Sequence, residues 1–350
     1  MTRQYPGVAE ELQRLASDLR ALDNVLDDRL AEEASAYLSA NAGWLVDLDW
    51  AEAASSFPHL LPSPVDEMMV FGEPPITFYR GPRVYADALF WVTSSTEIHD
   101  HGFDGAFVSL FGSSLHCVYN WTSDGRSRDG TAAFGALALE QAEILHPGSA
   151  RQIVSGPCLV HVVQHLGTPS ATLVVRNYHT PGVVQQRYHL SGVALPSKRD
   201  LRWKRLLRVL RDTSESRLAD IVDRRLRAAS AAESVDLLAS AMGLVEELPY
   251  ERLLETVERC HPGEGQRLAG AAAESSRLDI LSARCAALMT PEAKLQLSAR
   301  SLGLSGHRAA SLDAASPTVS PSGRTRTALT EQVAIACAAL GDETGTRRAI

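Results

Sequence analysis

The chain of 350 residues is 45% hydrophobic and 22% charged, and it carries a formal net charge of −8. This composition indicates a globular protein of one extended or two separate domains, and its acidic balance argues against nucleic acid, which needs a basic face. No apolar run approaches the roughly 20 residues of a membrane-spanning helix, so a membrane is not an expected partner either. The amino terminus lacks the apolar core of a signal peptide, and five scattered cysteines without a CxxC pair favour a reducing compartment. We therefore expect a cytoplasmic protein.

Residues 1–74 are predicted to form helices followed by a lead-in loop. Apolar side chains recur at helical spacing over residues 8–22 and again over residues 26–41. Amphipathic helices of this kind bury their apolar stripe, so we expect both to pack against the part of the chain that follows. The segment 57–75 is rich in proline, which predicts a loop.

Residues 75–192 are predicted to be all-β. Short runs rich in β-branched and aromatic residues are separated by turn clusters at 122–130 and 146–150. Many short strands with regular turns are typical of a barrel or a sandwich. The predicted strands are residues 78–80, 84–92, 105–111, 115–121, 136–140, 151–154, 158–163, 171–178 and 183–190.

Residues 193–350 are predicted to form an α-helical domain. Leucine stripes of helical period are separated by proline and glycine turn signals. The segment 305–327 is rich in serine, proline and glycine and predicts a flexible loop, before a last helix at 328–340. We expect a homo-oligomer, if one forms, to assemble through this domain. The predicted helices are residues 197–212, 215–229, 234–248, 250–260 and 279–289.

Two histidines at the start of the segment 99–112 are predicted to face the same way. Side chains alternate along a strand, so His99 and His101 lie on one face and Asp100 on the other. Two imidazoles on one strand face offer two neighbouring ligands to a metal ion.

Two more histidines lie on one face of a later strand. His161, in the middle of the β-branched run 158–163, is the candidate third ligand. His165 competes for that role, but it lies about 13 Å further along the same face, which favours a place in the wall of a pocket. Three imidazoles with open positions suit non-haem iron and also zinc. The other histidines of this region are predicted to be structural: His116, His146, His179 and His189.

These residues resemble the motifs of the cupin superfamily, whose members are small antiparallel β-barrels. His99 and His101, followed by Gly105 and Gly112, fit the first motif, G-x5-H-x-H-x3/4-E-x6-G, from its HxH onward. His161 falls on the histidine of the second motif. Because Gly105 stands at the position of the glutamate, the expected site is three neutral histidines without a carboxylate. Such a site is similar to that of the thiol dioxygenases, the group of cysteine dioxygenase.

The resemblance to thiol dioxygenases implies an Fe(II) cofactor, with O2 and a small thiol or amino-acid-like molecule as substrates. Tyr178 falls on the family's active-site tyrosine, which implies a catalytic hydrogen bond to bound oxygen. Arg80 lies near the family's carboxylate-binding arginine. Arg176, which replaces a family histidine, is a second candidate both for binding the substrate and for a catalytic role. His165 is the further candidate for substrate binding.

Three other functions remain compatible with the sequence. An oxygenase with a different substrate fits, because Arg176 and Val174 depart from the thiol dioxygenase pattern. Zinc in the same site would indicate a metal-dependent isomerase or hydrolase. A non-enzymatic cupin would be a sensor or binding module, with the helical half as its partner surface.

Overall fold

The computed structural model describes residues 6–25, 27–55, 72, 75–92, 96–167, 169–197, 201–242 and 250–280, with a few residues between 290 and 302. Most of the predicted loop 57–75 and of the predicted helix 279–289, and all of segments 305–327 and 328–340, lie outside these residues. The helices are α1 (Pro6–Leu22), a 3-10 turn η1 (Asp27–Arg29), α2 (Leu30–Asp47), α3 (Trp50–Ser55), α4 (Leu201–Leu226), α5 (Ala231–Met242), α6 (Tyr250–Cys260) and α7 (Gly265–Ile280). The strands are β1 (Pro75–Arg80), β2 (Val84–Trp91), β3 (His99–His101), β4 (Gly105–Phe111), β5 (Ser114–Arg126), β6 (Ala133–Leu145), β7 (Ala150–Ile153), β8 (Gly156–His165), β9 (Ser170–Asn177), β10 (Gln186–His189) and β11 (Val193–Pro196).

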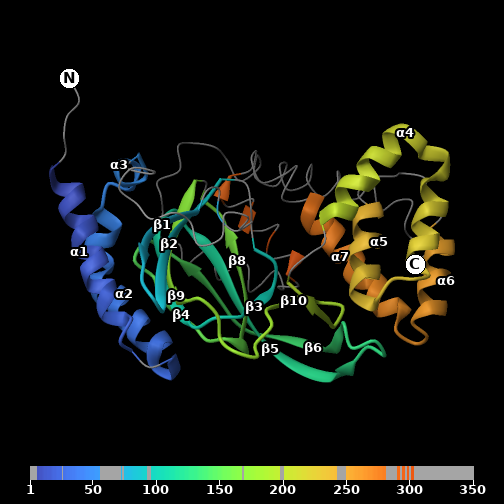
Figure 1. The fold of residues 1–350 in the computed structure, drawn as a ribbon, viewed down its shortest axis with the longest axis horizontal. Helices are drawn as coiled ribbons and strands as arrows, with labels where there is room; N and C mark the ends of the chain where they lie inside the picture. The colour runs from blue at the N-terminus through green and yellow to red at the C-terminus, as the bar shows by residue number, and fades with distance from the viewer. Residues whose placement is uncertain are drawn as a thin grey trace, which may run out of the picture.

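The strands form two antiparallel units. One is a five-stranded sheet in the order β1-β2-β9-β4-β7, and the other is a closed barrel in the order β10-β11-β6-β5-β8-β3. Helices α1 and α2 lie along the five-stranded sheet, and α4 to α7 lie at the opposite end of the molecule (Figure 1). The prediction of a β-barrel followed by helices is confirmed.

Residues of the five-stranded sheet alternate between a helix-covered face and a cavity. On β2, Val84 and Ala86 belong to an apolar cluster with Leu19 of α1 and Leu38 of α2. Asp87, the next residue along the strand, lines a cavity on the opposite face. Because the side-chain period of a strand is two, the helices cover one face of the sheet, and the other face is left to form a site.

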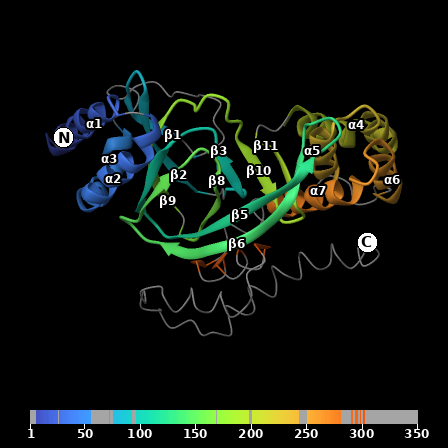
Figure 2. The ribbon, with the colours of Figure 1, turned by 90° about the horizontal axis from the view of Figure 1, so that it is seen from below.

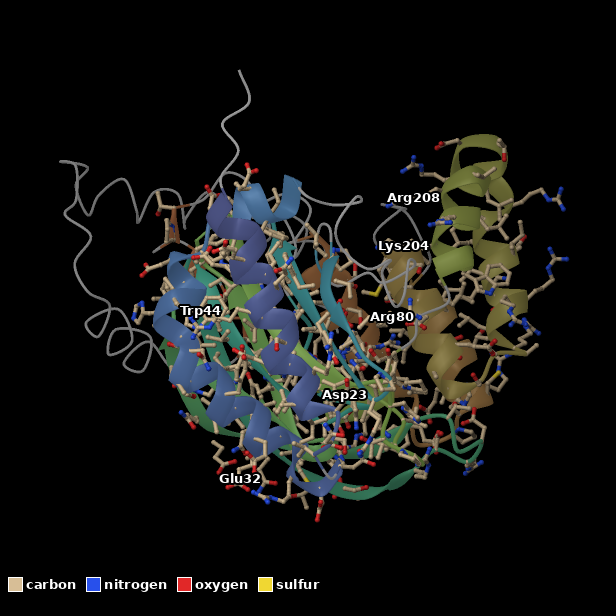
Figure 3. All side chains as sticks on the ribbon, turned by 60° about the vertical axis from the view of Figure 1, so that its left-hand side comes forward. Asp23, Glu32, Trp44, Arg80, Lys204 and Arg208 are labelled. Carbon is tan, nitrogen blue, oxygen red and sulfur yellow. The ribbon has the colours of Figure 1, made fainter. Side chains whose placement is uncertain are left out.

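Asp23, which follows α1, ties the helical layer to the sheet (Figure 3). Its carboxylate accepts hydrogen bonds from the backbone amides of Arg83 and Val84, each at 2.9 Å, and from the hydroxyl of Tyr79. Burial and the hydrogen bond to Asp23 raise the pKa of Tyr79 to about 12. The hydroxyl of Tyr79 therefore keeps its proton and remains a donor at neutral pH. Together these hydrogen bonds hold the turn between β1 and β2 against the end of α1.

The helical half shares its core with the barrel. Phe134 of β6 and Val193 and Leu195 of β11 belong to the same apolar cluster as Leu238 of α5 and Leu268 of α7. Strand β11 falls in the segment predicted to be helical, but it pairs with β10 and β6. A run of four residues is too short to show a period, and for that reason the sequence did not reveal it.

Two further differences concern the helices. The predicted helices 197–212 and 215–229 form one continuous helix, α4. Helix α7 was not predicted, because its buried face is made largely of small residues such as Ala271 and Ala272 rather than a leucine stripe. None of the helices that the structure describes combines the length and the apolar character needed to cross a membrane.

Polar contacts fix the helices to the barrel. Strand β5 continues to Arg126, inside the predicted turn 122–130. The β5–β6 hairpin reaches toward α5 (Figure 2), and Asp129 in its loop accepts a hydrogen bond from the amide of Ala231 at the start of α5. Arg187 of β10, which is 1% exposed, donates to Asp236 of α5. The site in the barrel is therefore supported from both ends of the molecule.

Candidate metal centre

Strand β3 carries the two histidines that were predicted to share a face. His99 and His101 are buried, and the centroids of their rings lie 4.7 Å apart. Asp100 points away from them, as expected. Its carboxylate accepts hydrogen bonds from the amide of Gln186 at 2.6 Å and from the hydroxyl of Tyr188 at 2.7 Å. Asp100 thus anchors β3 to the neighbouring strand β10, and the two imidazoles face the cavity.

His161 meets this pair from β8, where it is the antiparallel partner of His99. The Nε2 atoms of His101 and His161 are 2.8 Å apart, and one nitrogen from each of the three rings lies within 4.8 Å of the others. Two ligands at right angles, each about 2.1 Å from an ion, would be about 3 Å apart. Two nitrogen lone pairs at 2.8 Å repel unless a proton or a cation lies between them. The three rings can therefore hold one metal ion.

Burial keeps the three imidazoles neutral, which is the form that binds metals. Desolvation lowers the pKa of His99 below the usual value of 6.5 and lowers the pKa values of His101 and His161 well below it. The neighbouring His99 and the positive charge of Arg176 lower the pKa of His101 further. A metal ion therefore meets little competition from protons at neutral pH.

A hydrogen bond to the backbone sets the orientation of His99. Its Nδ1 lies 2.7 Å from the carbonyl oxygen of Glu97. A carbonyl only accepts, so Nδ1 carries the proton and Nε2 carries the lone pair that a metal needs. Metal-binding histidines commonly donate their second nitrogen in this way.

A chain of side chains behind His161 does the same for that ligand. Nδ1 of His161 is 3.0 Å from Nε2 of His116, and Nδ1 of His116 is 3.0 Å from Oε1 of Glu143. Hydrogen bonds from His116 and Arg151 lower the pKa of Glu143 to about 2. The ionised carboxylate only accepts, so Nδ1 of His116 donates to Glu143, and Nε2 of His116 is left to accept the Nδ1 proton of His161. Nε2 of His161 is thereby left with its lone pair toward the other two histidines.

His116 was predicted to be structural, and the structure places it against a candidate ligand. It is the cross-strand partner of Val163 in the β5–β8 pair. Val163 and His161 share a face of β8, so His116 is the diagonal neighbour of His161. This contact depends on the register of two strands 45 residues apart, which no local pattern reveals.

The backbone explains why no carboxylate completes the site at Gly105. This residue pairs with Arg176 of β9. A Cβ atom at Gly105 would lie 2.1 Å from the carbonyl oxygen of Val175 and 3.0 Å from Cβ of Arg176. Any side chain there would force the strands apart, so a glutamate ligand is sterically excluded, and Arg176 projects beside the site instead.

The histidines open onto a cavity of about 90 Å³ between β8 and the five-stranded sheet. This is room for roughly six water molecules or a small substrate. His161 and His165 both line it, in agreement with their predicted common face, and so does Arg176. The lining residues are Asp87, Leu89, Trp91, Thr96, His99, His101, Phe103, Phe107, Ile153, His161, Val163, His165, Thr172, Val174, Arg176 and Gln185.

Tyr178 and Arg80, contrary to the prediction, are not among the residues that line the cavity. Strand β9 ends at Asn177, and Tyr178 beyond it is 39% exposed, with its hydroxyl donating to the carbonyl of Gly81 at 2.7 Å. Arg80 is exposed at the end of β1 (Figure 3).

The chain matches no known family model and no curated protein. Partial matches to solved structures include the DMSP lyases RdDddP and RnDddQII (15% identity, 32% of this chain and 46% of that chain, TM-score 0.21). They also include recombinant oxalate oxidase in complex with glycolate (19%, 29% and 45%, 0.20) and the capsular polysaccharide assembling protein CapF from Staphylococcus aureus (12%, 36% and 30%, 0.22). In each case the match spans less than half of the other chain. At these TM-scores the similarity carries no argument. The assignment of a closed barrel is based on the strand order of this structure alone.

We predict that replacing His99, His101 or His161 with Ala lowers the metal content of the purified protein at least about tenfold, since loss of a supporting group alone has that effect. His165→Ala is the matched control, because His165 lies on the same strand face and lines the same cavity. Elemental analysis of protein made without a histidine tag measures the effect. Full metal loading in all three variants would place the site elsewhere.

The chain behind His161 gives a second prediction. Glu143→Gln removes the charge that holds His116 and should weaken metal affinity about 10- to 100-fold. Glu140→Gln, an exposed position on the same strand, is the control. Competition with a chelator of known affinity measures both variants. Equal affinities for the two would show that Glu143 does not support the site.

Proposed function

We propose that this chain is a mononuclear non-haem iron oxygenase that acts with O2 on a small thiol or amino-acid-like substrate. The observation that carries the proposal is a set of three buried, neutral imidazoles beside an arginine in one cavity. The cupin-like motifs and the closed barrel support it. Ferrous iron held by three neutral histidines would supply a redox-active Lewis acid with positions open to substrate and O2.

Arg176 and Asp87 supply opposite charges to the cavity wall. The guanidinium of Arg176 lies over the rings of Phe103 at 4.3 Å and Tyr85 at 4.8 Å, and 3.7 Å from the carboxylate of Asp87. Oδ1 of Asp87 also accepts a hydrogen bond from Thr77 at 2.7 Å. A planar guanidinium matches the two oxygens of a carboxylate, and Asp87 suits an ammonium group. Together the pair favours a zwitterionic, amino-acid-like molecule.

The proximity of Arg176 to the histidines joins the two parts of the site. The positive charge of Arg176 lowers the pKa of His101. The ring of Phe103 contacts both residues, with its centroid 4.3 Å from the guanidinium and 4.6 Å from the ring centroid of His101. A substrate carboxylate bound by Arg176 would therefore hold the rest of a small molecule next to the three imidazoles. The apolar side chains of Phe107, Val163 and Val174 would exclude water from the reacting end.

Zinc is the alternative metal, because three neutral histidines with open positions are also a zinc site. The same residues would then bind and orient the substrate of an isomerase or hydrolase. If no metal binds, the cavity would serve a sensor or binding module. These alternatives differ in two measurable properties, the metal that is bound and the use of O2.

The test is metal analysis of the purified chain, followed by anaerobic reconstitution with Fe(II) and an oxygen-electrode screen of small thiols and amino acids. We expect iron to bind at about one ion per chain and O2 to be consumed only when a substrate is present. Zinc binding without O2 uptake would support the isomerase or hydrolase instead. A chain that binds no metal would contradict both enzymes.

Arg176 gives a sharper prediction for this reaction. Loss of a buried charge contact costs roughly 2–5 kcal/mol, so Arg176→Ala should raise KM about 30-fold or more while the iron content is unchanged. Arg176→Lys should restore the affinity only in part, since an ammonium lacks the planar fork. Arg80→Ala, at the exposed arginine that the sequence also suggested, is the control. Unchanged kinetics in Arg176→Ala would exclude Arg176 as the substrate-binding cation.

A further inference from the structure

The cavity has a second polar end, centred on His165. Along β8, residues 161, 163 and 165 all line the cavity, so the ring of His165 lies roughly 13 Å along the strand from the three-histidine group. The side chain is 4% exposed. The proposed reaction leaves this end of the cavity without a role.

The ring of His165 is held rigidly. It stacks on Trp91 with ring centroids 4.4 Å apart and an interplanar angle of 18°. Its Nδ1 lies 3.1 Å from the hydroxyl of Ser114 and 2.9 Å from the hydroxyl of Ser170. The indole N–H of Trp91 in turn donates to Thr172 at 3.3 Å. Three contacts thus fix the imidazole in a single orientation, and a fourth holds the indole on which it stacks.

The two serines determine which nitrogen carries the proton. A hydroxyl can donate or accept, but among the described residues Nδ1 of His165 is the one hydrogen-bond partner of either hydroxyl, so both hydroxyl hydrogens are directed at Nδ1. Nδ1 therefore accepts, and the proton of the neutral ring sits on Nε2. Burial, followed by the charge of Lys294, lowers the pKa of His165 to about 3, so the ring is neutral at physiological pH.

The Nε2–H group is a buried donor that has no hydrogen-bond partner among the residues that the structure describes. Buried donors are nearly always satisfied, and leaving one unpaired is costly. The unpaired group belongs to a residue that lines the cavity rather than to the packed core. A molecule in the cavity that carries an acceptor at this end would satisfy it.

We propose that His165 forms a second binding point, which recognises a hydrogen-bond acceptor such as a carbonyl or carboxylate at the far end of the substrate. This inference rests on the proposed function for the opposite end, where Arg176 and Asp87 bind the amino-acid head. The substrate class is then an elongated amino acid with an acceptor on its side chain. The nearby charge of Lys294, which is 7% exposed, disfavours a cationic side chain.

Calorimetric titration of the full-length protein under anaerobic conditions tests this. The probes are L-glutamine and L-citrulline, which carry carbonyl groups at two distances from the head, with L-norleucine as the apolar control and L-lysine as the cationic one. We expect at least one carbonyl ligand to bind roughly tenfold more tightly than norleucine, and lysine to bind more weakly than norleucine.

Two variants then assign the preference to His165. His165→Phe keeps a ring to stack on Trp91 but lacks the N–H, and it should abolish the preference while norleucine affinity and metal content stay unchanged. The double variant S114A/S170A keeps the imidazole and removes the groups that hold the proton on Nε2, so it should reduce the preference. If His165→Phe does not fold, the double variant alone tests the inference.

A preference that persists in both variants would overturn the inference and leave the proposed function standing. Equal binding of the carbonyl ligands and norleucine to the wild-type protein would do the same. If none of the four amino acids binds, both the inference and the proposed substrate class are overturned.

Discussion

The antiparallel pairing of β3 with β8 is the contact on which the candidate metal centre depends. It places His99 opposite His161, and a shift in the pairing before His101 allows the third ring to converge on the same point. Because side chains alternate along a strand, a slip of one residue would turn His161 to the other face of β8. Strand β5 on the far side of β8 adds a second constraint, since its register brings His116 behind His161.

The surrounding layers make this arrangement possible. Desolvating polar rings is unfavourable, and the cost is offset for two of the ligands by hydrogen bonds from Nδ1, to Glu97 and to His116. Nδ1 of His101 is buried and has no hydrogen-bond partner in the described part of the chain, so the site is less well satisfied than an ordinary core. A metal ion that binds only the folded chain would stabilise it by mass action. We infer that the helices α1 and α2 and the helical half hold the barrel in a form that the three histidines alone would not favour.

The local patterns in the sequence were sufficient to find the three clustered histidines but not their surroundings. The HxH spacing and the strand period identified His99, His101 and the shared face of His161 and His165, because these relations lie within single strands. The role of His116 required a register between distant strands. The positions of Tyr178 and Arg80 were transferred from a motif, and neither residue lines the cavity. Strand β9 ends before Tyr178, and Arg80 lies at an exposed strand end.

The same limit applies to the architecture. Strong periodicity revealed the helix-rich half, whereas β11 was too short and α7 too poor in leucine to be recognised. The sequence shows a glycine, Gly105, where the motif has a glutamate. It does not show the reason, which is the close approach of β9, because that approach is a property of tertiary packing. Sequence patterns therefore located the centre of the site, and packing decided which side chains complete it.

The central claim is that one metal ion lies between the three imidazoles. A crystal of the Fe(II)-loaded protein, measured on both sides of the iron absorption edge, tests this most directly. We expect a single anomalous difference peak within bonding distance, about 2.1 Å, of Nε2 of His99, His101 and His161, with no carboxylate ligand from the chain. A peak at His116, His165 or a surface carboxylate, with none between these three rings, would contradict the account.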